Sequence, residues 1–397
     1  MTISKQYPIY IQACGFHSAL GKSQQEIHKR LLDNKSPDMV VVDNVLNDGC
    51  STVVGKVNDA LPELPKHLKH FNSRNNRLAL SALTQIHDDV IRAIETYGNE
   101  RVAVIIGTST SGISDGESAL DTLFKSGSFP AEYHYSKQEL GNPAEFVSEY
   151  FSLEGPCYAI STACSSSGRV FLSAKRMLKA NLVDAVIVGG VDSLCKLTLN
   201  GFRCLDALST THCNPFSKNR DGINIGEAAA FMLLSREETD SKVALLGAGD
   251  SSDAHHISAP HPEGIGAIEA MGKALNDAQL DASDIGYINA HGTATPLNDA
   301  MESKAISRVF DHVPVSSTKP LTGHTLGAAS AVEAAISWHI LTYNLQLPIQ
   351  INDGEHDDLP IQLIEEHQYL APKKAILSNS FAFGGNNISL IFGYANE

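Results

Sequence analysis

The sequence predicts an α/β protein in which short buried strands alternate with amphipathic helices. Nine short apolar runs, rich in Val and Ile, have the length of buried strands, and several are followed by helical patterns. Runs of this composition are typical of parallel strands that helices cover on both faces. The predicted strands are 8–13, 102–107, 157–161, 185–190, 231–234, 243–247, 285–290, 375–378 and 388–393.

Six further segments carry apolar residues three and four positions apart. This spacing places the apolar side chains on one face of a helix, which can then pack on a sheet. The predicted helices are 75–97, 144–151, 165–180, 264–278, 300–310 and 328–343.

The two halves of the chain resemble each other faintly. Residues 107–118 match residues 292–303 at five of twelve positions, and each segment follows a predicted strand. Residues 161–164 and 316–324 also correspond, because each segment joins a strand to a long helix. We therefore expect two related halves, 1–240 and 241–397, separated within the charged segment 236–242.

Composition and charge exclude several classes of protein. The 397 residues are 43% hydrophobic, enough to bury a large core, so intrinsic disorder is excluded. With 30 Lys+Arg against 45 Asp+Glu the net charge is −15. This negative charge argues against binding of the chain as a whole to nucleic acid or to an anionic membrane surface, because both are polyanions. No run approaches the ~20 apolar residues of a membrane span, and the start lacks a signal-peptide layout. We expect a cytoplasmic protein.

Seven cysteines are scattered along the sequence. An odd number without a C-x-x-C pair predicts neither a disulfide framework nor a structural metal site. Most of them are expected to be small buried hydrophobic residues.

Cys164 differs from the other cysteines in its surroundings. It lies in Ser161-Thr-Ala-Cys164-Ser-Ser, where a strand gives way through small residues to a helix. Such a turn exposes a side chain at a helix N-terminus, where the helix dipole favours the nucleophilic thiolate near neutral pH. The residues before it do not form a G-x-S-x-G motif, which disfavours a serine hydrolase. The turn alone leaves a catalytic and a structural Cys164 equally open.

Two histidines shift this balance toward catalysis. His291 opens His-Gly-Thr-Ala-Thr-Pro directly after the predicted strand 285–290, where α/β proteins place ligand-binding groups. His324 lies in Lys319-Pro-Leu-Thr-Gly-His324-Thr-Leu-Gly-Ala-Ala, between a probable strand end and a helix. Either histidine alone is more often a structural residue.

Together these segments resemble the signature blocks of the β-ketoacyl-[acyl carrier protein] synthases. The blocks around Cys164, His291 and His324, and a fourth, Asn379-Ser-Phe-Ala-Phe-Gly-Gly-Asn-Asn387, occur in the family's order. The likeness covers nearly the whole chain. It implies the thiolase fold, in which two duplicated βα halves stack as five αβαβα layers and subunits pair into dimers.

The resemblance also implies the chemistry and the role of each site residue. Cys164 holds the growing acyl chain as a thioester, while His291 and His324 bind the malonyl thioester, favour loss of carbon dioxide and stabilise the enolate. Backbone N–H groups of Cys164 and Phe383 form the oxyanion hole. Lys319 and its partner Glu333 hold His324 and shape the field around Cys164. No cofactor is implied beyond the phosphopantetheine of an acyl carrier protein, which carries the substrates.

A gate and an acyl pocket are implied as well. Phe381 and Phe383 match the family's gating loop, in which Gly384 and Gly385 permit movement. Asp253 begins a second gate segment, and Thr110 and Phe202 match positions that line the acyl pocket.

Docking of the acidic carrier protein requires a basic surface on this acidic chain. Segment 65–77 supplies Lys66, Lys69, Arg74 and Arg77 at the family's docking position, with a solvated helix start as the plainer alternative. Asp206 stands where relatives often carry a basic residue, so part of the docking surface is expected to differ.

The two histidines indicate an elongating synthase. Segments 192–202 and 220–229 are similar to synthases of bacterial aryl-polyene pathways, and housekeeping fatty acid elongation is the alternative. The partner is expected to be an identical subunit or a catalytically silent chain-length-factor homologue. A third class, in which this chain is itself such a silent subunit, is disfavoured by the presence of Cys164, His291, His324 and Lys319. A thiolase is set aside because segment 379–387 contains no cysteine.

Overall fold

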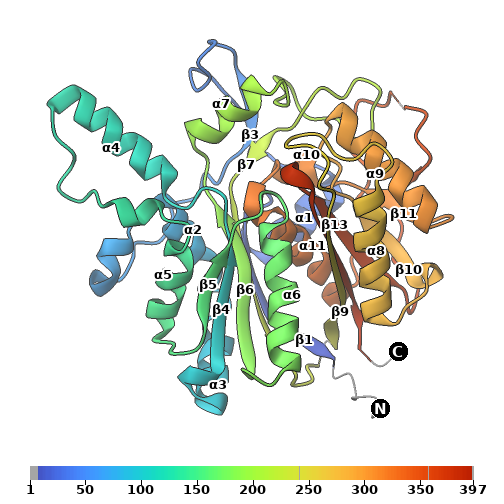
Figure 1. Cartoon of the computed structure of the whole chain (residues 1–397), viewed down its shortest axis with the longest axis horizontal. Coiled ribbons are helices and arrows are strands. Elements are labelled where there is room, and N and C mark those ends of the chain that lie inside the picture. Colours follow the sequence, from blue (N-terminus) through green and yellow to red (C-terminus); the bar gives the residue numbers. More distant parts are fainter. Residues whose placement is uncertain (1–7, 241, 356, 396–397) are drawn as a thin grey trace.

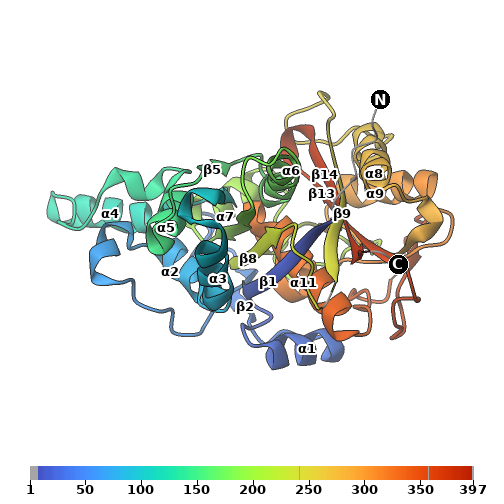
Figure 2. The same ribbon diagram turned by 90° about the horizontal axis from the view of Figure 1, so that it is seen from below.

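The computed structural model describes residues 8–240, 242–355 and 357–395. From left to right in Figure 1, layers of helices and layers of strands alternate, five layers in all. The two chain ends lie at the lower right. Figure 2 shows the same layers from below, with α11 between the strands of the two halves. The prediction of a five-layered α/β fold is confirmed.

Two sets of five strands, each with the same order and directions, form most of the sheet in the described part of the chain. One set runs β1 (Ile9–His17), β8 (Ala228–Ser235), β6 (Ala185–Asp192), β4 (Val102–Gly107) and β5 (Cys157–Ile160). The other runs β9 (Val243–Ser252), β14 (Asn386–Tyr394), β13 (Ala375–Phe381), β10 (Ile285–Asn289) and β11 (Pro314–Ser316), with β12 (Gln362–Leu363) at its edge.

In each set the first three strands are antiparallel and the last three are parallel. Expecting parallel strands throughout was therefore wrong for half of the sheet. A Val/Ile-rich run indicates burial on both faces, and burial does not depend on the direction of the neighbouring strand. A short antiparallel pairing between Ile9–Tyr10 and Ala244–Leu245 joins the two sets.

Helices form the other three layers. The central layer is α6 (Ser166–Lys179) against α11 (Ala329–Tyr343), and the outer layers contain α5 (Asn142–Phe151) on one side and α8 (Ile265–Ala278) with α9 (Pro296–Val309) on the other. The hydrophobic core around α6 and α11 takes residues from both halves. The predicted helix 75–97 is two helices, α2 (Arg74–Leu83) and α3 (His87–Tyr97). Between them, Gln85 hydrogen-bonds the backbone of Phe16 in β1.

Besides the one-turn helix α10 (Lys319–Thr322), three longer helices were not expected: α1 (Gln24–Asp33), α4 (Ile113–Ser126) and α7 (Lys196–Cys204). They lie at the rim of the molecule, and α4 projects from it in Figure 1. Their apolar faces are narrow, with two, two and one buried residues, so their periodic signal is weak. The small sheet β2 (Met39–Val42), β3 (Thr52–Gly55) and β7 (Ile225–Gly226) lies at the same end as α7.

Close approach of the central helices depends on Gly168. A Cβ atom at this position would lie 2.6 Å from Cγ2 of Ile388 and 2.9 Å from Oγ of Ser330 at the start of α11. The two helices therefore bring the carboxyl ends of β5 and β11 to one place. No helix in the described ranges is long and apolar enough to cross a membrane.

Candidate active site

Cys164 lies in a sharp turn between β5 and α6, as the sequence predicts. Ala163 has the left-handed φ of 53°, a strained conformation that turns the chain toward the helix. The Cys164 side chain lines a cavity but is only 6% exposed.

Burial dominates the titration of this thiol. Desolvation raises the pKa of Cys164 to about 11, although the charge of Lys319 and the backbone N–H groups of Phe383 and Cys164 itself act to lower it. Burial therefore acts against the expected thiolate near neutral pH.

His324 contacts the sulfur of Cys164 directly. Its Nε2 atom lies 3.1 Å from Sγ, while Nδ1 accepts the backbone N–H of Leu326 at 3.0 Å. Because Nδ1 uses its lone pair in this bond, the proton of the neutral ring is on Nε2. Burial and the charge of Lys319 lower the pKa of His324 well below its ordinary value, so the ring is a neutral N–H donor.

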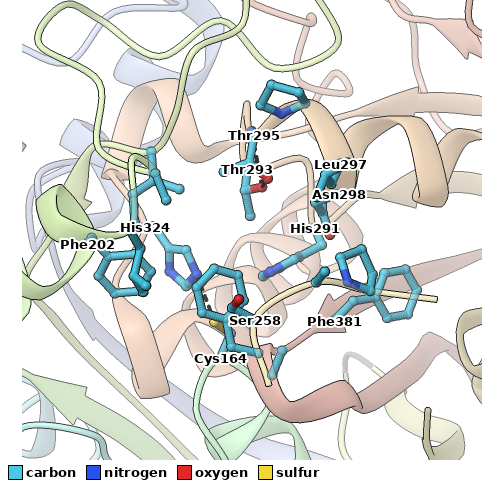
Figure 3. A pocket seen from close by; sticks show the side chains of 18 of the residues that line it. Cys164, Phe202, Ser258, His291, Thr293, Thr295, Leu297, Asn298, His324 and Phe381 are labelled. Atoms are coloured by element: carbon cyan, nitrogen blue, oxygen red, sulfur yellow. Dashed lines mark hydrogen bonds between the residues drawn. The ribbon is translucent and has the colours of Figure 1, made fainter. Parts of the chain in front are cut away.

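His291 completes the cluster from the end of β10. Its ring lies 5.3 Å from the His324 ring, nearly perpendicular to it, and both rings point toward Cys164 in Figure 3. The backbone N–H groups of His291 and Gly292 each donate to the buried carboxylate of Glu302 at 2.8 Å. Burial and Lys319 also lower the pKa of His291 well below its ordinary value, so this ring is neutral too.

Lys319 and Glu333 form a buried ion pair beside these residues. The Lys319 Nζ atom donates to Glu333 Oε1 at 2.6 Å, and the two residues are 2% and 3% exposed. Lys319 lowers the pKa of Cys164, His291 and His324 through its charge. Among the residues described, no hydrogen bond joins Lys319 to His324. The pKa shifts thus support the expected effect of Lys319 on the electrostatic field around Cys164. The hydrogen bonds do not support its expected role of holding the His324 ring.

The side chains of the predicted gate and acyl pocket, Phe381, Phe383, Asp253 and Phe202, line the same cavity, which has a volume of about 280 Å³. Phe202 on α7 packs against Phe383 with ring centroids 5.6 Å apart, and Phe381 lies on the other side of Cys164 in Figure 3. Gly384 and Gly385 have φ values of 79° and 72°, which only glycine adopts easily. Asp253 lines the cavity and accepts a hydrogen bond from Asn387 at 2.8 Å.

Comparison with protein families accounts for almost the whole chain. Residues 7–240 match the β-ketoacyl synthase N-terminal domain, and residues 243–352 match the β-ketoacyl synthase C-terminal domain. The chain belongs to the β-ketoacyl synthase family. It is an elongating β-ketoacyl-[acyl carrier protein] synthase, an acyltransferase that extends an acyl chain by decarboxylative condensation.

Several curated relatives and solved structures are similar to this synthase over most of their length. It is 31% identical to 3-oxoacyl-[acyl-carrier-protein] synthase 2 of Coxiella burnetii, covering 96% of this chain and 97% of the relative. The ketosynthase ApeO in complex with its chain length factor ApeC, from Xenorhabdus doucetiae, is 47% identical, with a TM-score of 0.94 and complete coverage of both chains. A β-ketoacyl synthase from Burkholderia phymatum is 28% identical, with a TM-score of 0.87 and coverage of 98% and 100%.

Thr110 is not part of the cavity of the synthase. Its side chain is fully buried and donates to Oδ1 of Asp192 at 2.7 Å, and it does not line the cavity at Cys164. Placing Thr110 in the acyl pocket is therefore not supported by this structure. A polar threonine at this position serves a buried carboxylate instead.

The predicted docking segment of the synthase separates into two parts. Lys66 and Lys69 are exposed on the 3₁₀ helix η1 (Lys66–Phe71). Arg74 instead pairs with the fully buried Glu227, and Arg77 donates to the carbonyls of Leu61 and Pro62. The basic edge is thus smaller than expected, because folding uses both arginines internally.

Two buried carboxylates of the synthase were not recognised in the sequence. Glu302 holds the turn at His291, and the internal repeat could have indicated it, since the matched positions include Glu302 and Glu117. Asp192 holds the turn at Thr110, and a polar residue at the end of a strand has no distinguishing pattern in the sequence. The N–H of Leu326, which determines the His324 tautomer, is a backbone group that no sequence pattern indicates.

Proposed function

We propose that Cys164 carries the acyl chain during the condensation. Its thiolate attacks the thioester of an acyl carrier protein, the phosphopantetheine thiol leaves, and the acyl group remains on Sγ. The observation that supports this role is the 3.1 Å contact between His324 Nε2 and the sulfur, and the backbone N–H groups of Phe383 and Cys164 also act to lower the pKa of the thiol. These donors stabilise the thiolate as it attacks the thioester.

The two histidines act on the malonyl substrate as neutral donors. Their N–H groups bind the thioester oxygen of malonyl carrier protein, where negative charge develops as carbon dioxide leaves. The enolate carbon then attacks the acyl carbonyl on Cys164. A tetrahedral oxyanion forms against the N–H groups of Phe383 and Cys164, the Cys164 thiolate leaves, and the β-ketoacyl product remains on the carrier. Burial, together with the positive charge of Lys319, keeps both rings unprotonated.

Cys164, His291 and His324 are residue types that can also bind a metal ion, but the tautomer of His324 argues against a metal site. Ligand atoms of Cys164, His291 and His324 lie within 4.8 Å of one another. A metal ligand needs a free lone pair, but the bond from Leu326 leaves the proton on Nε2 of His324, the atom that faces Cys164. We therefore assign the cluster to proton donation and propose no metal or cofactor.

The substrates arrive on the phosphopantetheine of an acyl carrier protein. Lys66 and Lys69 supply the exposed positive charge that an acidic carrier requires. Because the chain is 47% identical to a ketosynthase that forms a complex with its chain length factor, a heterodimer with such a homologue is favoured over a homodimer. The same similarity favours the aryl-polyene pathway over housekeeping fatty acid elongation.

A silent chain-length-factor role is the competing function from another class. It predicts no acyl transfer to Cys164 even when carrier and partner are present. Cys164, His291 and His324 line one cavity and Lys319 forms a buried ion pair with Glu333, which favours the catalytic role.

Intact-mass spectrometry after incubation with acyl carrier protein distinguishes the two roles. The wild type should gain the mass of one acyl group, and Cys164→Ala should not. Cys204→Ala is the matched control, because Cys204 is an exposed free thiol outside the cavity, and this variant should be acylated normally. Absence of an adduct on the wild type, with the homologous partner subunit added, would refute the catalytic role.

Two further assignments complete the proposal. The chain divides into an N-terminal half, 1–240, that carries Cys164, and a C-terminal half, 241–397, that carries the two histidines, Lys319 and the gate loop. The seven cysteines are all free thiols, which suits the reducing cytoplasm.

A further inference from the structure

Asp192 is a buried carboxylate that lies between the two halves without a cationic partner among the described residues. It is the last residue of β6 and is fully buried. A single buried charge is costly unless hydrogen bonds replace the lost water. Asp192 therefore needs an unusually complete set of donors.

Those donors come from the turn that follows β4. The Oδ1 atom accepts the backbone N–H groups of Ser109 and Thr110 at 2.8 and 2.7 Å, and the hydroxyl groups of Thr108 and Thr110 at 2.9 and 2.7 Å. Four donors on one oxygen fix the position of the carboxylate firmly within the N-terminal half.

The second oxygen reaches into the other half of the chain. Oδ2 accepts the backbone N–H of Ala328 at 3.0 Å, in the 3₁₀ turn η5 (Leu326–Ala328) that starts two residues after His324. The fit is tight, because a Cβ atom on Gly327 would lie 2.8 Å from this oxygen. The carboxylate thus anchors a turn whose first residue, Leu326, has the strained φ of 53°.

This turn holds the catalytic ring. The N–H of Leu326 donates to His324 Nδ1, which leaves the proton on Nε2 and directs it at Cys164 Sγ. We propose that Asp192 is a positioning residue that keeps η5 in the conformation in which Leu326 fixes the tautomer and orientation of His324. The inference rests on the role proposed above for His324 and adds a residue that contacts neither substrate nor sulfur.

The test is Asp192→Asn in the full-length protein. The amide has nearly the same shape, but its NH₂ group cannot accept, so either Ala328 or the donors at Oδ1 lose their partner. We expect kcat for malonyl-carrier decarboxylation to fall about tenfold with KM unchanged, since the carrier still docks normally. The ¹⁵N chemical shifts of the His324 ring should move toward a mixture of tautomers.

A matched variant separates this effect from a general loss of stability. Asp277→Asn removes a carboxylate that accepts the N–H of Ala248 and the ammonium of Lys175, far along the chain from η5. It should lower Tm without changing kcat or the His324 shifts. An Asp192→Asn enzyme with wild-type kcat, or with unchanged His324 shifts, would overturn the proposal.

A milder variant covers the case in which Asp192→Asn does not fold. Thr110→Val removes one hydroxyl donor to Oδ1 and keeps the side-chain shape, so a smaller fall in kcat with unchanged KM is expected; unchanged kcat would then overturn the proposal. If the wild type itself fails to decarboxylate malonyl carrier protein, the proposed function fails. If the wild type is active and both variants match it, only the role of Asp192 fails.

Discussion

His324 presents its Nε2–H to the sulfur of Cys164 across 3.1 Å because its Nδ1 is occupied by the N–H of Leu326. The imidazole is therefore a hydrogen-bond donor to the sulfur and not an acceptor of its proton. A donor stabilises the thiolate that leaves at the end of each condensation, and it serves equally for the enolate oxygen of the malonyl substrate. One ring can thus act in both half-reactions without changing its protonation state.

The reactivity of Cys164 should depend steeply on pH. With a pKa of about 11, only about one thiol in a thousand is ionised at pH 8, and the rate of alkylation by iodoacetamide should rise about tenfold per pH unit between pH 7 and 10. Peptide mapping at each pH measures this rate for Cys164 alone. A plateau below pH 8 would contradict it.

The charge of Lys319 should be visible in the same measurement. Lys319→Met removes the cation that lowers the pKa of Cys164, so alkylation should be slower at every pH. Adding Glu333→Gln removes an anion that raises this pKa, so the double variant should react at an intermediate rate. Cys204 in the same protein is the internal control, and its rate should stay constant.

Reversing the exposed charges of the docking edge should weaken carrier binding. We expect Lys66→Glu with Lys69→Glu to raise KM for carrier-bound substrate about tenfold at low ionic strength, and less at high salt, with kcat unchanged. Lys29→Glu, an equal charge change at an exposed site on α1, is the matched control and should leave KM unchanged. An equal effect of both changes would mean that only net charge matters.

Arg74 should affect stability instead of docking. Its removal in Arg74→Met leaves the fully buried carboxylate of Glu227 without its cation, which should cost about 3 kcal/mol of unfolding free energy. Adding Glu227→Gln should recover part of this loss. Urea unfolding measures both, and KM for the carrier should not change at a temperature where the variant is folded. A normal stability with raised KM would restore Arg74 to the docking surface.

His339 should make the protein sensitive to acid. It is 5% exposed beside His28, and burial lowers its pKa to about 3. In the unfolded chain the His339 imidazole binds a proton near pH 6.5, whereas in the folded chain it stays neutral at that pH. The contribution of His339 to the free energy of unfolding is therefore fully present above pH 6.5 and is lost as the pH decreases. Between pH 7 and pH 5 the free energy of unfolding of His339→Gln should therefore decrease by about 2 kcal/mol less than that of the wild type. The exposed control His212→Gln should follow the wild type.

The sequence predicts the strands more completely than the helices at the rim. All nine predicted strands are present, and most of them are Val/Ile runs that are buried on both faces; the exception is β5, which is partly exposed. Helices α1, α4 and α7 were not predicted because each buries so few residues that its pattern is mostly polar. The antiparallel direction of β8 and β14 has no local signal, because neighbours far along the chain decide it.

The sequence alone determined the chemistry of this protein: Cys164, His291, His324 and Lys319 in ordered blocks indicate the family, and the repeat indicates two halves. Only the tertiary structure decided how these groups behave. It buries the thiol, which raises its pKa, and it commits Arg74, Arg77 and Thr110 to internal partners. It also sets the His324 tautomer through a backbone N–H. Residue types limit which reactions are available, whereas desolvation and hydrogen-bond partners depend on the surrounding fold.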